Sequence, residues 1–92
     1  MQTSSEVTEL QVDLPDDVDL HARPAANFVR TAMRFEARVW VAAAEREVDA
    51  KSLLSVVALG VRRGTAIKLR AEGEDAMAAI QALATTVAEL RE

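Results

Sequence analysis

The sequence contains no cysteine and only one histidine. Without cysteine the chain can form neither disulfides nor thiolate metal sites, a composition that suits a reducing compartment. A single imidazole also excludes every metal motif that combines several histidines, and we expect neither a bound metal nor a cofactor. His21 is the one imidazole available for chemistry at neutral pH, so it is the first candidate for a functional residue.

Long apolar runs are missing too. None approaches the roughly 20 residues that cross a bilayer, and residues 1–9 are too polar and acidic for a signal peptide. Positive charge is not in excess, since 11 lysines and arginines face 15 aspartates and glutamates, for a net charge of -4. Non-specific nucleic-acid binding depends on such an excess. We therefore expect a cytoplasmic protein that neither enters the membrane nor binds nucleic acid.

What the sequence does contain is enough for one packed domain. The chain has 92 residues, of which 50% are hydrophobic. This composition supports a core, and the length leaves no room for a second domain. We expect a single domain over residues 1–92, in which residues 1–7 form a flexible N-terminal extension.

Strands are predicted where apolar and polar residues alternate. This pattern occurs in residues 10–14, 35–41 and 67–71, and each of these segments should bury one face. A shorter strand near residues 46–49 should return beside the second one. The connection between those two runs through Ala44 and holds no glycine or asparagine, which argues against a tight primed hairpin turn.

Helical spacing predicts the first two helices. One begins near Pro24, whose missing N–H costs nothing in a first turn. Its apolar stripe consists of Ala25, Phe28, Val29 and Ala32. The other covers residues 53–59, between a capping hydroxyl at Ser52 and a left-handed stop at Gly60.

A third, longer helix should start near Gly73, with Glu74 and Asp75 in its first turn. Its apolar stripe consists of Ala76, Ile80, Leu83, Val87 and Leu90. The element order is then β-α-β-β-α-β-α. It predicts an α+β fold, an open-faced β-sandwich in which a four-stranded antiparallel sheet has three helices on one face. Trp40 should lie on the open face.

His21 precedes the first helix, and Arg23 follows two residues later. The first N–H groups of a helix have no intrahelical acceptor, and the helix dipole favours anions at that end. A phosphoryl group on the His21 ring could accept hydrogen bonds from the backbone N–H groups of Ala22 and Arg23, and from the Arg23 guanidinium. Imidazole is a good nucleophile and a good leaving group. The alternative is that His21 is only an exposed or capping residue.

Residues 21–25 read HARPA, which resembles the active-site motif of the HPr phosphocarriers of the sugar phosphotransferase system. Residues 51–60, which begin KSLL and end LG, resemble that family's lysine-serine motif and its helix ending. Ser52 follows His21 by 31 residues (52 − 21), which matches the family's spacing. The likeness covers about residues 8–89. With two motifs in register, a phosphorylated His21 is the preferred interpretation.

The resemblance implies a phosphoryl-group carrier rather than an independent enzyme. Enzyme I, with phosphoenolpyruvate as the original donor, would phosphorylate His21 on Nδ1. The carrier would then pass the group to an enzyme IIA domain in carbohydrate uptake. Arg23 would support the phosphate. We expect the carrier to be a monomer.

A docking surface is predicted beside His21. Its basic part follows one face of the first helix and consists of Arg23, Asn27, Arg30 and Arg34. Its apolar part, which the resemblance implies for enzyme I and enzyme IIA, consists of Ala26, Leu53 and Leu54, to which we add Val57. The alternative is an ordinary solvated helix face beside core residues, and we assign Val56 and Leu59 to the core.

Ser52 has two interpretations that the sequence leaves open. Its hydroxyl can cap the short helix, which is worth about 1 kcal/mol. In some HPr proteins the matching serine is phosphorylated by a regulatory kinase, so the partners could include an HPr serine kinase/phosphorylase and a transcription regulator. Phosphate there would repel an acidic partner.

Asp19 departs from the family's pattern, in which glycine is usual at this position. Asp16 and Asp17 lie close by in the sequence. A carboxylate near phosphohistidine would repel the phosphoryl group and alter its transfer or hydrolysis.

Three other functions stand as alternatives to the carrier in sugar uptake. A paralogous carrier could serve nitrogen-related regulation or a dihydroxyacetone kinase. A binding module could act through Ser52 on a transcription regulator, although it would not need both His21 and Arg23. A serine hydrolase is disfavoured, because Ser52 is explained as a cap and no nucleophile elbow is present.

Overall fold

The computed structural model describes residues 7–91, which contain four strands and three helices. In chain order they are β1 (Val7–Asp13), α1 (Ala22–Ala32), β2 (Arg38–Ala43), β3 (Arg46–Asp49), α2 (Leu53–Leu59), β4 (Ala66–Glu72) and α3 (Ala76–Ala88). The predicted element order is confirmed. Of the extension expected at residues 1–7, residues 1–6 lie outside the described part, and Val7 already belongs to β1.

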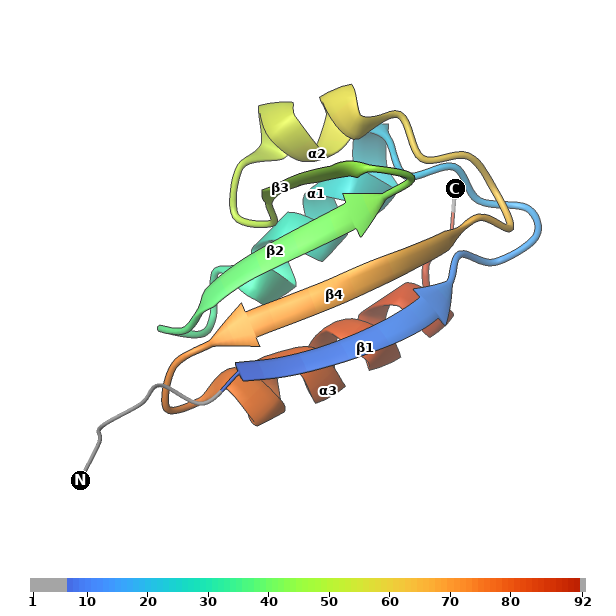
Figure 1. The fold of residues 1–92 in the computed structure, drawn as a ribbon. Helices are drawn as coiled ribbons and strands as arrows, with labels where there is room; N and C mark the ends of the chain where they lie inside the picture. The colour runs from blue at the N-terminus through green and yellow to red at the C-terminus, as the bar shows by residue number, and fades with distance from the viewer. Residues whose placement is uncertain (1–6, 92) are drawn as a thin grey trace.

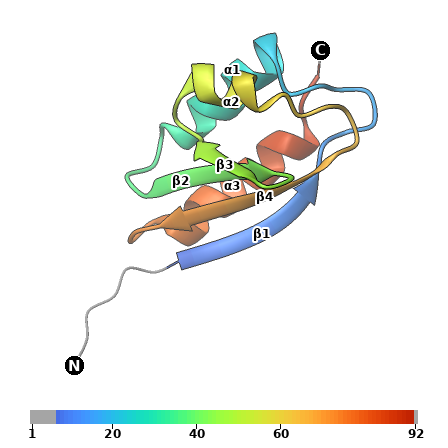
Figure 2. The same cartoon turned by 45° about the horizontal axis from the view of Figure 1, so that its top comes forward.

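The strands form one antiparallel sheet in the order β1-β4-β2-β3. Figure 1 looks onto the open face of this sheet, with α1 and α3 behind it. In Figure 2, α1 and α2 lie close together near β3, and α3 packs against β1 and β4. The predicted α+β open-faced sandwich is therefore confirmed.

The core lies between the sheet and the helices. Buried residues of β2 and β4 stand directly opposite one another, as in the pairs Val39–Ala71 and Val41–Leu69. Such cross-strand pairs stabilise a sheet and fix its register. The apolar stripes predicted for α1 and α3 are buried as well, and Phe28 is the largest fully buried side chain.

The buried face predicted for residues 10–14 is only partly covered. Leu14 is buried, but Leu10 keeps 41% of its surface exposed although it pairs with the buried Leu69. β1 is an edge strand with a neighbour on one side only. The prediction is wrong at Leu10 for that reason, since alternation in a sequence does not tell an edge strand from a central one.

The second predicted strand begins later than residue 35, because β2 starts at Arg38. The Asp75 carboxylate accepts hydrogen bonds from the backbone N–H groups of Glu36, at 2.9 Å, and Ala37, at 2.8 Å. The bond from Glu36, followed by that from Ala37, keeps the pKa of Asp75 below its ordinary value. Asp75 is the N-cap residue of α3 rather than part of its first turn, which corrects the sequence prediction.

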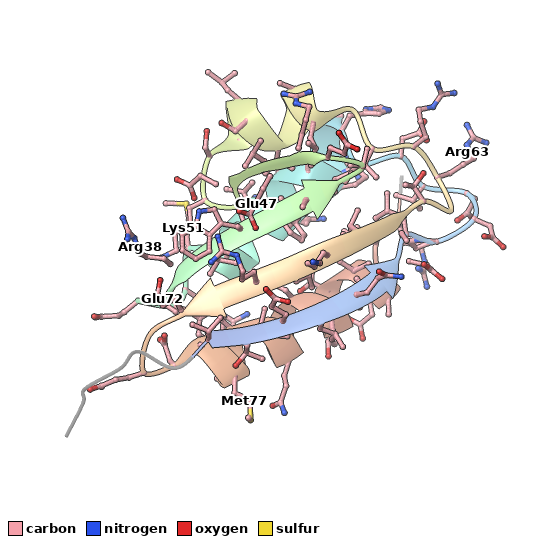
Figure 3. The ribbon with its side chains drawn as sticks, viewed as in Figure 1. Arg38, Glu47, Lys51, Arg63, Glu72 and Met77 are labelled. Carbon is pink, nitrogen blue, oxygen red and sulfur yellow. The ribbon has the colours of Figure 1, made fainter. Side chains whose placement is uncertain are left out.

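Trp40 lies on the open face, as predicted. The Arg70 guanidinium stacks 3.9 Å from the centre of its ring and also binds Glu47 through two hydrogen bonds of 2.9 and 3.0 Å. Figure 3 shows Glu47 and Arg38 on this side of the sheet. The bonds from Arg70 lower the pKa of Glu47. These contacts link β4 to its neighbour β2 and, across β2, to β3.

The turn between β2 and β3 contradicts the sequence prediction. Ala43 pairs with Arg46, so only Ala44 and Glu45 connect the two strands. Ala44 has a φ of 54°, in the left-handed region that glycine or asparagine usually fills in tight hairpins. β2 pairs with β3 and also with β4, and β3 contacts α2. These contacts stabilise a turn that the local sequence disfavours.

Replacing Ala44 by glycine should therefore stabilise the protein. Alanine pays about 1 kcal/mol to adopt a left-handed conformation, and glycine does not. We expect Ala44→Gly to raise Tm by about 4–8 °C in thermal unfolding. The control is Ala43→Gly, inside β2, which should lower stability by about 0.5–1 kcal/mol. An equal loss of stability in both variants would contradict the strain at Ala44.

Candidate functional site

His21 is the N-cap residue of α1 and has an extended backbone, with a φ of -147° and a ψ of 171°. Its ring makes no capping hydrogen bond to the helix, and 54% of the side chain is exposed. Two neighbours fix its position, because Leu20 before it and Pro24 after it are buried. An exposed imidazole on a rigid support is thus presented to solvent.

The residue after His21 has an unusual backbone. Ala22 has a φ of 52°, a value that costs a residue other than glycine about 1–2 kcal/mol. The first helical hydrogen bond runs from the Ala25 N–H to the His21 carbonyl, at 3.4 Å. The N–H groups of Ala22 and Arg23 precede this bond, and a helix start leaves such donors without helical acceptors. The predicted anion-binding arrangement is therefore brought together at one end of α1, beside the exposed Arg23.

Asp19 lies beside His21 and among arginines. Its Oδ2 is 3.8 Å from Nε2 of His21, while its Oδ1 accepts a 2.7 Å hydrogen bond from the Arg63 N–H. The guanidinium Nε atoms of Arg63 and Arg62 are 3.6 and 3.9 Å from the same Oδ1. The bond from the Arg63 N–H is the main cause that lowers the pKa of Asp19, and these charges add to it. Asp19 is therefore ionised at neutral pH.

The basic stripe predicted on α1 is solvent-facing. Arg23, Arg30 and Arg34 are exposed. Asn27 is half-buried, and its side-chain oxygen accepts a 2.8 Å hydrogen bond from Arg30. The prediction is wrong at Arg34, which lies beyond Ala32, the last residue of α1, so the stripe on the helix itself ends at Arg30.

The apolar residues predicted for docking are exposed too. Leu53, Leu54 and Val57 keep 44%, 84% and 40% of their surface exposed, and Ala26 is half-buried. Val56 is fully buried, and Leu59 is partly buried against the core, as predicted. The short α2 thus presents one apolar side to solvent and one to the core.

A hollow of about 530 Å³ joins α1 to α2 beside these residues. It is lined by Ala26, Val29, Arg30, Met33, Lys51 and Leu53. Sequence reasoning missed Met33, which is 64% exposed at the C-cap of α1. Lys51, which the sequence offered only as the first residue of the KSLL motif, lines the hollow too, and its ammonium donates a 2.6 Å hydrogen bond to the Phe35 carbonyl. Only the spacing of Met33 from Val29 and Ala26 along one helix face could have indicated it.

Ser52 caps α2 as predicted. Its hydroxyl accepts a 3.3 Å hydrogen bond from the Ser55 N–H, and Gly60 ends the helix with a φ of 69°. The half-buried Ser52 precedes the exposed Leu53 and Leu54 directly. The cap and the apolar docking residues therefore share one short helix.

Residues 8–89 match the family model described as the PTS HPr component phosphorylation site. The chain belongs to the HPr family of phosphocarrier proteins. The phosphocarrier protein HPr of Haloferax volcanii is 47% identical over 72 residues, which make up 76% of this chain and 80% of that protein. HPr-C-His from Thermoanaerobacter tengcongensis has a TM-score of 0.85 at 41% identity, covering 88% of this chain and 91% of its own.

A protein named for catabolite repression is similar as well. Crh, the catabolite repression HPr of Bacillus subtilis, has a TM-score of 0.68 at 37% identity, covering 91% of this chain and 100% of its own. Among residues 7–91, no helix is long and apolar enough to cross a membrane. The comparisons thereby establish the family and the fold.

Proposed function

We propose that this HPr family member carries a phosphoryl group on His21, accepting it from enzyme I and donating it to an enzyme IIA domain in carbohydrate uptake. The observation that carries the proposal is the exposed His21 ring at the entrance of α1, with Arg23 and helix N–H groups beside it. A residue that only capped the helix would bond its side chain to the helix, and His21 does not.

The chemistry needs one nucleophile and one anion site. The Nδ1 lone pair of His21 attacks phosphorus, an N–P bond forms, and the bond from phosphorus to the enzyme I donor breaks, with its electron pair returning to the donor. The phosphoryl oxygens then accept hydrogen bonds from the N–H groups of Ala22 and Arg23 and from the Arg23 guanidinium. Each such helix-terminus interaction contributes only about 0.3–2 kcal/mol, so the group stays transferable.

Both partners would use the same docking surface. Its apolar part is Ala26, Leu53, Leu54 and Val57, and its basic part is Arg23, Asn27, Arg30 and Arg34. Exposed apolar side chains next to guanidinium groups suit a partner with an apolar patch and an acidic rim. Charge complementarity of this kind chiefly raises the association rate.

The proposal is tested by phosphorylation of the wild-type protein. We expect incubation with enzyme I and phosphoenolpyruvate to add one phosphoryl group, which is acid-labile and alkali-stable and maps to His21 by fragment mass spectrometry. Addition of an enzyme IIA domain should then remove it. If the protein acquires no label, or if the label is acid-stable, the carrier proposal is wrong.

Ser52 supports a second proposal, which is regulation by phosphorylation of its hydroxyl. Ser52 borders the docking surface at Leu53, so negative charge there would oppose an acidic partner. We expect Ser52→Asp to slow acceptance of the phosphoryl group from enzyme I about tenfold, with the fold intact by circular dichroism. Ser52→Asn is the matched control, because asparagine caps a helix equally well without charge. Equal slowing in both variants would mean that only the cap matters.

A further inference from the structure

Asp19 is a feature of this chain that the phosphocarrier function does not explain. Its side chain is only 17% exposed and its position is fixed from several sides. The Arg63 N–H donates to Oδ1 at 2.7 Å, and the guanidinium groups of Arg62 and Arg63 lie within 4 Å of that oxygen. A carboxylate bound in this way is a rigid group rather than a mobile surface charge.

The backbone fixes Asp19 relative to His21. The N–H of the intervening Leu20 donates to the Val61 carbonyl at 2.9 Å, and the His21 N–H donates to the Asp19 carbonyl at 3.0 Å. Leu20 is also fully buried. Residues 19–21 are therefore tied to residues 61–63, the start of the loop that leads into β4. In Figure 3, Arg63 projects from this loop at the same end of the molecule as the entrance of α1.

The carboxylate is directed at one particular ring nitrogen. Its second oxygen, Oδ2, is 3.8 Å from Nε2 of His21, the nitrogen that does not receive the phosphoryl group. The ring is half exposed, so a small rotation of the side chain can shorten this distance to the 2.7–3.2 Å of a hydrogen bond. A carboxylate beside one imidazole nitrogen favours the tautomer that carries its proton there, which leaves the lone pair on the other nitrogen.

We propose that Asp19 is a positioning residue for phosphoryl transfer, which holds the proton of His21 on Nε2 and leaves Nδ1 as the nucleophile. This inference rests on the proposed phosphorylation of His21. It also reverses the expectation from sequence, in which the Asp19 charge only repelled the phosphoryl group. Two arginines offset that charge, and the carboxylate faces the nitrogen on the other side of the ring.

Asp19 would act in both transfer steps, when His21 accepts the phosphoryl group and when it donates it. When the Nδ1 lone pair of His21 attacks phosphorus, the ring keeps its proton on Nε2 and acquires one positive charge. The Asp19 carboxylate opposes that charge and stabilises the protonated ring. In the donating step the electron pair of the N–P bond returns to Nδ1, and a ring that is protonated on Nε2 is the better leaving group. No proton has to enter or leave the site in either step.

The test compares Asp19→Asn with the wild type by ¹⁵N–¹H spectroscopy of the His21 ring, at a pH where the imidazole is neutral. We expect the wild type to hold its ring proton on Nε2, and the Asp19→Asn variant to shift at least about a fifth of the population to Nδ1. Asp17→Asn is the control, since Asp17 is an exposed carboxylate in the same loop. An unchanged tautomer ratio in Asp19→Asn would overturn the proposal.

A rate measurement completes the test. Asp19→Asn should accept the phosphoryl group from enzyme I about tenfold more slowly, and Asp17→Asn should accept it at the wild-type rate. Asparagine keeps an oxygen for the Arg63 N–H, so a loss of rate together with a shifted tautomer cannot be assigned to a disrupted loop. A slower rate with an unchanged tautomer ratio would count against positioning. If wild-type His21 accepts no phosphoryl group, the proposed function fails, while the tautomer ratio still decides whether Asp19 orients the ring.

Discussion

Replacing His21 by alanine is expected to abolish phosphoryl acceptance completely. The chain has one histidine, so no second imidazole can take over the nucleophilic role. The ring is exposed and contributes no capping hydrogen bond, so its loss should leave stability within about 0.5 kcal/mol of the wild type. Label from phosphoenolpyruvate, counted after transfer from enzyme I, is the measurement. A His21→Ala variant that is folded and unlabelled would assign the phosphoryl group to His21.

Arg23→Ala provides the graded comparison for this experiment. The exposed Arg23 is proposed to support the phosphate and not to form the covalent bond, so the variant should still be labelled. We expect acceptance to slow about tenfold, equivalent to the 1.4 kcal/mol of one charge-assisted hydrogen bond. Equal labelling of His21→Ala and the wild type would contradict the proposed site. If Arg23→Ala accepts the phosphoryl group at the wild-type rate, Arg23 does not support the phosphate, but the assignment of His21 is unaffected.

Replacing Leu20 by alanine is expected to produce the largest loss of stability near the site. Leu20 is fully buried between Asp19 and His21, and removing a buried leucine side chain costs about 2–5 kcal/mol in lost burial and in the cavity left behind. For a domain of this length the change corresponds to a fall in Tm of roughly 10–30 °C. Thermal unfolding followed by circular dichroism measures it.

Leu54→Ala is the matched control for Leu20→Ala. The same side chain is deleted, but Leu54 is 84% exposed and belongs to the docking surface. Stability should change by no more than about 0.5 kcal/mol, while the affinity for enzyme I should fall about tenfold, which corresponds to 1.4 kcal/mol. If Leu54→Ala destabilises as much as Leu20→Ala, α2 depends on that side chain for folding and the docking assignment fails.

Several elements could be predicted from local sequence because their causes are local. Ser52 and Gly60 set the two ends of α2 through a side-chain cap and a left-handed residue, and both act within one helical turn. The helical spacing of the apolar residues around Phe28 was enough to predict α1. The position of His21 at the entrance of α1 followed from the same spacing.

Other features depend on residues that are far apart in the chain. The turn at Ala44 carries no local signal, and it forms because β2 and β3 pair. The late start of β2 depends on Asp75, whose carboxylate accepts hydrogen bonds from the N–H groups of Glu36 and Ala37, 39 and 38 residues earlier in the chain. The exposure of Leu10 follows from the edge position of β1. None of these contacts can be read from a pattern of neighbouring residues.

The sequence by itself determined the identity of the candidate nucleophile, since it contains one imidazole. It also determined the order of strands and helices, including the helix at whose start His21 lies. Only the tertiary structure decided what surrounds it. It brought the loop of Arg62 and Arg63 next to Asp19, and it directed the Asp19 carboxylate toward Nε2 of His21. The physical reason is that the effect of a carboxylate on a nearby group depends on the distance between them and on the other charges around the carboxylate, and folding sets both.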